Sequence, residues 1–272
     1  MKIILIRKSF LQRTKFVLCV FAVWCAFCFA GVLSRSGFAG SEVRSNREPA
    51  EELRVNTRNL TYRDGNCTVV VNYPSVGNSK VDAELDYWVY NTVQTFTSGI
   101  ETIKSSGQGR CSMVVDYTLS EPSAPFISIV FRIVTDMGGG IPYSGMAAFT
   151  YDLDDGRRLG YPDVFEDADG LLYFLSLYAH EVLLARLGDT FDSRVREGTK
   201  PDFFNFLIFT LTPDGITLFF PPDQVADQSL GEQDVCIALE KLKPYKPRPE
   251  IWSGNGGSFL GEQPIYKISI SH

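Results

Sequence analysis

The chain has 272 residues, with 26 Lys and Arg against 32 Asp and Glu, so its formal net charge is −6. The first 39 residues hold six of the basic residues and no acidic one, which leaves 20 basic against 32 acidic residues, a net −12, in the rest. This acidic balance argues against nucleic acid and anionic membrane surfaces as partners and favours basic ones.

Residues 1–39 are typical of an export signal. A basic segment precedes the uncharged apolar run 16–33, and Gly37 and Ala39 stand at the −3 and −1 positions of a cleavage site after Ala39. The apolar run also has about the minimum length of a membrane span. We therefore expect a periplasmic or secreted protein, with residues 1–39 either cleaved as a signal peptide or retained as a membrane anchor with the bulk of the chain outside the cytoplasm.

Three of the six cysteines follow this segment. Cys67 and Cys111 each begin a β-rich run, "CTVVVNY" and "CSMVVDYTL", and these runs flank one predicted helix. We expect the two cysteines to form a disulfide in an oxidising compartment, and Cys236 to be a buried thiol. One disulfide is too few for a disulfide scaffold, so a hydrophobic core must provide most of the stability.

The first elements alternate between helix and strand patterns. Residues 40–60 are polar and are expected to form a flexible tether. A helix is predicted from about Ser79, with Asp82 as a capping partner and an apolar face that recurs at helical spacing as far as Ile103. Strands are predicted over 67–73, 112–120, 126–136 and 144–153. The last three have short connections, which favour antiparallel pairing.

The remaining elements complete an α+β pattern. A helix over about 171–187 is apolar around most of its circumference and is expected to be well buried. The segment "FNFLIFTLTPDGITLFF" predicts a hairpin that turns at Pro213, Asp214 and Gly215. Short strands are expected around Cys236 and over 265–270.

These elements predict an α+β fold, in which two main helices pack on antiparallel sheets. One arrangement of the fold divides it into two half-domains, a strand–helix–strand unit over 61–140 and a second unit over 141–245. A Pro- and Gly-rich tail, 246–272, follows.

Candidate catalytic and metal-binding groups are few. His180 has Leu184 where a zinc-protease helix needs its second histidine, and the chain has no GxSxG motif. The acidic runs "DLDDG" and "EDADG" are explained by turns and helix caps, with a weak calcium site over 152–155 as the alternative to the first. Asp163 and Glu166 are the carboxylates considered for acid–base chemistry on a glycan. We predict no catalytic residue, no metal and no cofactor.

The stretch "MGGGIPYSG", residues 137–145, invites a phosphate-loop interpretation because three glycines stand in a row. It lacks the lysine and the Ser or Thr that complete such a loop, and Ile-Pro follows rather than a helix start. We interpret the glycines as a flexible connection between two strands, whose function would be contact with a partner.

Two segments resemble the extracellular region of the RsiV-type anti-sigma factors. "GGGIPYSGMAAFTYDLDDGRRLGYPDVF" resembles its strand-and-turn pattern, and "FTLTPDGITLFFPPDQVADQSLGEQDVCIALEKL" resembles its C-terminal signature. The upstream strand–helix–strand unit resembles the domain that precedes this region there and in PdaC-type peptidoglycan deacetylases. The likeness spans about 62–245. It implies an exported α+β module that is not itself catalytic, and the sigma-binding cytoplasmic part of that family has no counterpart in this sequence.

The resemblance also implies a partner and a site. The RsiV-type region is a receptor for lysozyme, so lysozyme or another basic envelope protein is the expected partner. The expected contact residues are Gly139, Ile141, Tyr143 and Asp223. The family commonly carries histidine where this chain has Ile141, tyrosine where it has Asp223, and an aromatic residue at Gln228. A glycan-acting accessory or enzyme domain and a purely structural envelope domain are the alternatives.

Overall fold

The computed structural model describes residues 55–100, 110–120, 126–138, 140–252 and 270–271. All of them belong to one compact unit, residues 52–272. The expected signal segment 1–39, the tether up to residue 54, Ile103, Gly139 and most of the expected strand 265–270 lie outside the described residues.

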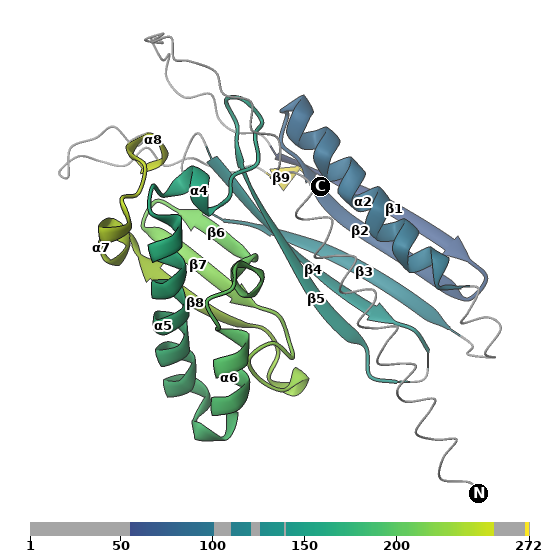
Figure 1. The fold of residues 1–272 in the computed structure, drawn as a ribbon. Helices are drawn as coiled ribbons and strands as arrows, with labels where there is room; N and C mark the ends of the chain where they lie inside the picture. Colours follow the sequence, from purple (N-terminus) through teal and green to yellow (C-terminus); the bar gives the residue numbers. More distant parts are fainter. Residues whose placement is uncertain (1–54, 101–109, 121–125, 139, 253–269, 272) are drawn as a thin grey trace, which may run out of the picture. The chain divides into compact units, whose positions relative to one another are not determined.

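A large sheet contains six strands in the order β5-β4-β3-β2-β1-β9 (Figure 1). The strands are β1 (Val55–Asp64), β2 (Cys67–Ser75), β3 (Cys111–Leu119), β4 (Phe126–Asp136), β5 (Tyr143–Asp152) and β9 (Ile270–Ser271). The pairs β3–β4 and β4–β5 are antiparallel, as expected. The pair β2–β3 is parallel, because helix α2 (Ser79–Ser98) lies in the connection and returns the chain to the end where β2 began.

Strand β1 was missed by sequence analysis. It begins at Val55, inside the segment 40–60 that was expected to be a flexible tether, and pairs antiparallel with β2. Most of its side chains are polar, so it lacks the apolar alternation of a half-buried strand. The available indication was the turn "DGN", in which Gly65 adopts a φ of 60° between the two strands.

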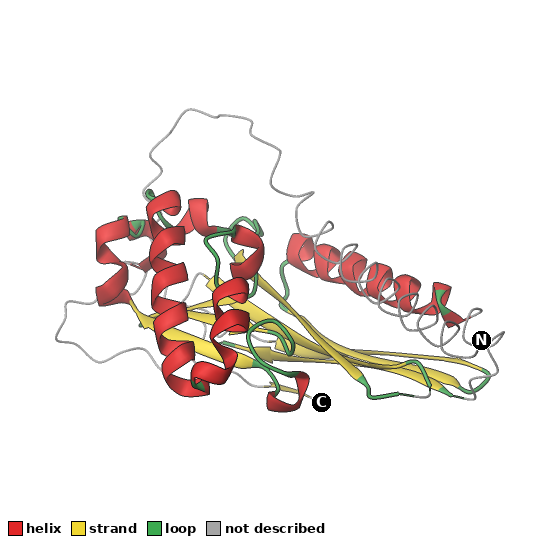
Figure 2. Cartoon of the chain, turned by 60° about the horizontal axis from the view of Figure 1, so that its bottom comes forward, coloured by secondary structure: helices red, strands yellow, loops and turns green. Residues whose placement is uncertain are grey.

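Helix α2 covers one face of the large sheet (Figure 2). It starts where expected, at Ser79, but the capping group is the side chain of Asn78, which accepts hydrogen bonds from the backbone N–H groups of Lys80 and Val81. Asp82 instead accepts from the backbone of Val76 at 2.8 Å and so holds the preceding turn. The predicted apolar face is confirmed by the buried residues Val81, Leu85, Val89, Val93, Phe96 and Ile100.

A second sheet contains three antiparallel strands in the order β6-β7-β8. They are β6 (Phe209–Thr212), β7 (Gly215–Phe220) and β8 (Gln233–Ala238), which confirm the predicted hairpin and the strand around Cys236. Gly215 has a φ of 147°, and a Cβ there would lie 2.1 Å from the carbonyl oxygen of Ile237. Only glycine fits this end of the turn.

The remaining helices are grouped against the small sheet (Figure 2). They are α4 (Tyr161–Val164), α5 (Ala168–Leu187), α6 (Asp192–Gly198), α7 (Leu239–Leu242) and α8 (Pro249–Trp252), with short 3-10 turns at Asp189–Phe191, Phe203–Phe206, Gln228–Leu230 and Lys243–Tyr245. Their core joins the inner face of α5 to the small sheet and contains many aromatic rings, among them the stacked pair Tyr161 and Phe209, 4.4 Å apart. The hydroxyl of the buried Tyr161 donates to the Phe206 carbonyl, and burial raises its pKa well above the ordinary value.

Helix α5 is less buried than its sequence predicts. Among the described helices it is long and apolar enough to cross a membrane, but Leu171, Leu175 and Leu183 are fully buried, as in the core helix of a folded domain. Tyr173 and Leu177 on its other side are 64 % and 73 % exposed. The prediction of burial around most of the circumference is wrong, because the small sheet lies on one side of the helix only.

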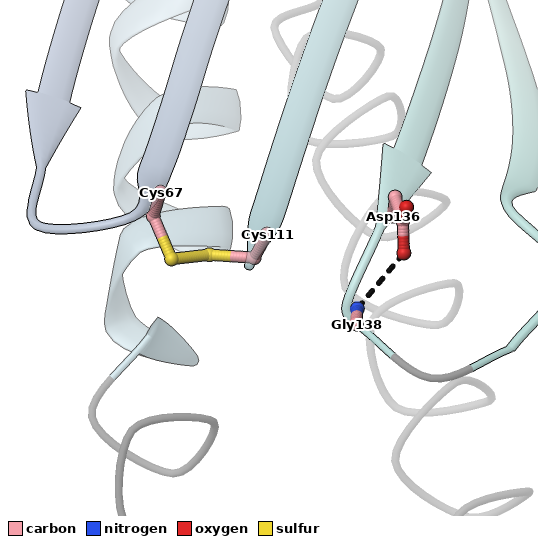
Figure 3. Close-up of a disulfide and its surroundings, with 4 residues drawn as sticks. All are labelled: Cys67, Cys111, Asp136 and Gly138. Carbon is pink, nitrogen blue, oxygen red and sulfur yellow. Dashed lines mark hydrogen bonds between the residues drawn. A yellow bond between two sulfur atoms is a disulfide. The ribbon is translucent and has the colours of Figure 1, made fainter. Parts of the chain in front are cut away.

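The predicted disulfide between Cys67 and Cys111 is present (Figure 3). The two residues are directly paired at the start of the parallel strands β2 and β3, with Cα atoms 4.4 Å apart. Cys236, in contrast, is exposed, so the prediction of a buried thiol is wrong. In β8 the neighbouring Val235 and Ile237 point into the core, and strand alternation turns Cys236 outward.

The two sheets contact each other. Val130, Met146 and Ala148 of the large sheet pack against Ile208 and Phe219. In addition, the buried hydroxyl of Ser128 in β4 accepts a hydrogen bond from the backbone of Leu211 in β6 at 3.0 Å. The expected half-domain boundary at residue 140 falls within the β4–β5 hairpin, whose strands pair from Phe126↔Asp152 to Thr135↔Tyr143.

Candidate partner-binding surface

The glycine-rich stretch forms the tip of the β4–β5 hairpin. Gly138 adopts a φ of 74°, and its N–H donates to the carboxylate of Asp136 at 2.8 Å (Figure 3). This is turn chemistry, since the aspartate side chain replaces a backbone acceptor and glycine tolerates the left-handed conformation. Ile141, after the turn, is 85 % exposed, whereas Tyr143 begins β5 and is half-buried.

A second loop runs from 221 to 232, between β7 and β8. Asp223 has a φ of 74°, uncommon for a residue other than glycine, and its carboxylate accepts from the backbone N–H of Gln228 at 3.1 Å. Arg194 of α6 reaches the carboxylates of Asp223 at 3.3 Å and Asp227 at 3.1 Å, and donates to the carbonyl of Ala226. The loop is therefore closed by its own side chains and held to α6.

The start of this loop is also fixed to its surroundings. The side-chain amide of Gln224 donates to the carbonyls of Gly198 and Asn205, both at 2.9 Å. Val225 and Ala226 are buried. These contacts fix the start of the loop to α6 and to the turn Phe203–Phe206.

Gln228 joins the two loops. Its side-chain amide donates to the carbonyl of Pro142 at 2.6 Å, while its backbone N–H donates to Asp223. Ile141, Tyr143 and Asp223, which the resemblance singled out from distant parts of the sequence, therefore belong to one surface. We call the residues 138, 140–143 and 223–230 the two-loop surface. Leu230, 47 % exposed, belongs to it and was not predicted.

A second tie lies just beyond this surface. Arg132 of β4 donates through Nε and Nη2 to the two carboxylate oxygens of Glu232, at 2.8 and 2.6 Å. This hydrogen bonding raises the pKa of Arg132 above its ordinary value. A bidentate pair of this kind fixes geometry as well as charge, so the loop is attached to the large sheet at Glu232 as well as at Gln228.

Next to this tie, part of the large sheet is open on the side away from α2. Val70, Val114 and Val134 are direct neighbours across β2, β3 and β4, and Val114 and Val134 are 39 % and 43 % exposed. A polar row borders the valines, in which Asn72 donates to Asp116 at 2.6 Å. We call Val70, Asn72, Val114, Asp116, Arg132 and Val134 the open face. Sequence analysis assigned one apolar face to β4 and overlooked Val134, although an outward valine recurs in neighbouring strands.

The carboxylates considered for glycan chemistry have structural partners. Asp163 accepts from the backbone N–H of Gly160 at 2.9 Å and pairs with Arg157, so it caps α4. Glu166 is exposed and lies 4.0 Å from Lys246. His180, the remaining candidate considered for chemistry, is half-buried on α5.

The acidic run at 152–155 forms a turn. The carboxylate of Asp152 accepts from the backbone of Asp154 at 2.8 Å, and that of Asp155 from the backbone of Arg157 at 2.7 Å. Loss of hydration raises the pKa of Asp152 above its ordinary value, and its like-charged neighbours add to the effect. Across the described residues, no three His, Cys, Asp or Glu side chains converge as metal ligands would.

Part of the chain matches a protein-family model. Residues 162–240 match the DUF3298 family model, a "Protein of unknown function". The DUF3298 segment contains α5, the small sheet and the 221–232 loop, but not the β4–β5 hairpin. The two-loop surface therefore combines the DUF3298 segment with residues outside it.

A curated relative matches a longer part of the chain. The chain is 27 % identical over 255 residues to the peptidoglycan-N-acetylmuramic acid deacetylase PdaC of Bacillus subtilis strain 168. This match covers 93 % of the chain and 55 % of PdaC, so the chain spans about half the length of that protein.

Solved structures of DUF3298 family proteins have the same fold. One from Pseudomonas aeruginosa PAO1 superposes with a TM-score of 0.54 at 13 % identity, covering 72 % of this chain and 98 % of that one. One from Bacteroides fragilis NCTC 9343 gives 0.50 at 12 % identity, covering 75 % and 98 %. At this identity the likeness concerns the fold alone.

Proposed function

We propose that this protein is an exported, non-catalytic binding module of the bacterial envelope, and that its two-loop surface binds a cell-wall-directed protein such as lysozyme. The observation that carries the proposal is the hydrogen bond from Gln228 to the carbonyl of Pro142, which unites two loops distant in sequence around the exposed Ile141. Exposed, braced loops on a rigid scaffold are the usual place for recognition.

The cell-wall assignment is supported by the relationship to PdaC, whose name states that it acts on peptidoglycan. Export is supported by the Cys67–Cys111 disulfide, because such bonds persist in oxidising compartments. The basic segment and apolar run of residues 1–39 agree with it.

The charge of the chain favours a basic partner. Beyond residue 39 the net charge is −12, and arginines of the folded unit such as Arg58, Arg132 and Arg194 are paired with carboxylates. Complementary charge speeds encounter and selects among partners, and its effect weakens as salt rises. A lysozyme of high positive charge fits this requirement.

The test is a binding measurement with the exported protein and hen egg-white lysozyme, by calorimetry at low and high salt. We expect binding at low salt that weakens as salt rises. The apolar side chain of Ile141 is exposed to solvent, so we expect Ile141→Ser to lower the affinity about tenfold. Leu177→Ser, at a leucine on α5 that is 73 % exposed against 85 % for Ile141, is the control and should leave the affinity unchanged. Absence of binding at low salt contradicts the proposal.

The second candidate is a glycan-acting accessory or enzyme domain, favoured by the name of PdaC and by Asp163 and Glu166 near α4. Incubation with purified peptidoglycan, followed by chromatography of soluble fragments and assay of released acetate, tests this function. Products that disappear in Glu166→Ala would establish it, and product formation unchanged in Glu166→Ala and Asp163→Ala would remove the residue assignment.

A further inference from the structure

The open face leaves apolar surface that the fold does not cover. Within a solvated sheet face, outward positions are ordinarily polar. Here Val70 pairs with Val114 and Val114 pairs with Val134, so three outward valines form one continuous band across β2, β3 and β4. Helix α2 covers the opposite side of the same sheet (Figure 1), whereas Val114 and Val134 on this side are 39 % and 43 % exposed.

The band continues toward the two-loop surface. Leu230 stands in the sequence between Gln228, which is tied to Pro142, and Glu232, which is tied to Arg132. Both ties fix the loop to the β4–β5 part of the sheet, next to Val134 and its pairing partner Ser144. The exposed Leu230 therefore stands between two residues that are tied to the β4–β5 hairpin, on which Val134 also lies.

Acidic groups border the band. Asp116 is exposed on β3, two residues from Val114, and Asp136 lies at the end of β4, two residues from Val134. Among the described residues, Asp116 and Asp136 form no salt bridge, while the nearest arginine, Arg132, is engaged by Glu232. An apolar centre with a charged rim is the arrangement found in protein interfaces.

We propose that the open face is a docking surface for a basic protein, with the three valines as its apolar centre and the bordering carboxylates as its rim. The charge decides between occupants. A second copy of this chain would bring acidic rim against acidic rim, and an anionic lipid surface would be repelled in the same way. A basic partner gains from both the rim and the valines. This inference rests on the proposed function and extends the binding site from the loops to the sheet.

The test compares two arginine substitutions on opposite faces. Val134→Arg introduces a positive charge at the 43 % exposed end of the valine band on the open face, and Tyr87→Arg introduces the same charge at a 58 % exposed position on α2. Two probes are used with the exported protein, hen egg-white lysozyme and a synthetic peptide of alternating lysine and valine. We expect Val134→Arg to weaken binding about tenfold and Tyr87→Arg to change it less than about twofold.

A second, milder substitution on the open face tests the same surface with less risk of disturbing the fold. Val114→Thr keeps the side-chain shape and a β-branched residue, and should weaken binding about threefold through lost apolar contact. Unfolding temperature and an intact Cys67–Cys111 disulfide, verified by mass spectrometry, show that each variant is folded.

The outcomes separate the two proposals. If lysozyme binds the wild type and Val134→Arg equally, or if both arginine variants weaken binding alike, the open face is not the docking surface while the proposed function stands. If the peptide binds through Val134 and lysozyme does not bind, the open face stands and the lysozyme assignment fails. If neither probe binds at low salt, both are overturned.

Discussion

The two faces of the large sheet both carry apolar side chains, which are buried on one face and exposed on the other. On the face under α2, Val69, Met113, Val115 and Phe131 are at most 1 % exposed. On the open face, Val114 and Val134 are 39 % and 43 % exposed, although they alternate with those core residues along the same strands. The covered face stabilises the fold by burial. We expect the open valines to contribute little to stability, and the proposed docking surface gives them a different role.

The largest expected effect concerns the centre of the covered face. Phe131 is fully buried, with its ring 4.3 Å from that of Trp88 on α2 and 5.9 Å from that of Phe149. We expect Phe131→Ala to lower the free energy of unfolding by about 3–5 kcal/mol through lost burial and the cavity left behind, measured by urea denaturation.

The matched control is Val134→Ala, three residues farther along β4 on the open face. It should change stability by no more than about 0.5–1 kcal/mol, as surface substitutions do. A loss comparable with that of Phe131→Ala would show that the open valines serve the fold, and the contrast between the faces would fail.

The next effect concerns the bond that joins β2 and β3 at their common end. The Cys67–Cys111 disulfide joins residues 44 positions apart in the sequence. Replacing both cysteines by alanine removes this constraint on the unfolded chain. We expect a loss of about 2–4 kcal/mol in thermal or chemical unfolding. Cys236→Ala, which removes an exposed thiol, should leave stability nearly unchanged, and a larger loss there would indicate an unrecognised role of β8.

A smaller effect concerns the helix that covers only one face. Asn78→Ala removes the side chain that accepts from the first N–H groups of α2 and should cost about 1 kcal/mol. Ser79→Ala, an exposed neighbour without this role, is the control. Lysozyme affinity should be the same in both variants, and a large loss of affinity in Asn78→Ala alone would mean that the binding surface depends on α2.

The smallest effect is a pH dependence of stability that arises from Asp152, the last residue of β5. Its pKa is raised in the folded state because burial removes hydration, so the folded protein holds this proton more tightly than the unfolded chain. Its contribution to stability therefore falls as pH rises through the region just above the ordinary value of 3.8. Asp152→Asn should flatten this part of the stability profile, measured by unfolding at several pH values. A profile unchanged by the substitution would contradict the assignment.

Much of the fold follows from patterns in the sequence. The alternation in β4, the helical spacing in α2 and the turn at Pro213–Gly215 predicted those elements, because each depends on neighbours in sequence. The disulfide was predicted from two cysteines at equivalent positions of neighbouring strands. Strand β1 was not, since its stability comes from backbone pairing with β2 rather than from an apolar face. The exposure of Leu177 was not predicted either, because the spacing of apolar residues in a helix does not show which of its sides packs against another element.

The residues proposed for the candidate site came from the resemblance, which singled out Gly139, Ile141, Tyr143 and Asp223, and Gly139 lies outside the described residues. The structure joins the segments of the other three through the side chain of Gln228, where the family commonly carries an aromatic residue, and their role in binding stays a prediction. Leu230 and Val134 were missed, because the sequence does not show which single apolar residues of strands and loops lie next to one another on the surface. The register between β2, β3 and β4, which places three valines in line, is a tertiary property.

The most direct test of the contrast between the faces is methyl NMR of the valines during titration with lysozyme. We expect the resonances of Val70, Val114 and Val134 to shift or broaden with added lysozyme, while those of Val69, Val71 and Val115 on the covered face stay in place. Perturbations confined to the α2 side, or an unperturbed spectrum while lysozyme binds, would contradict it.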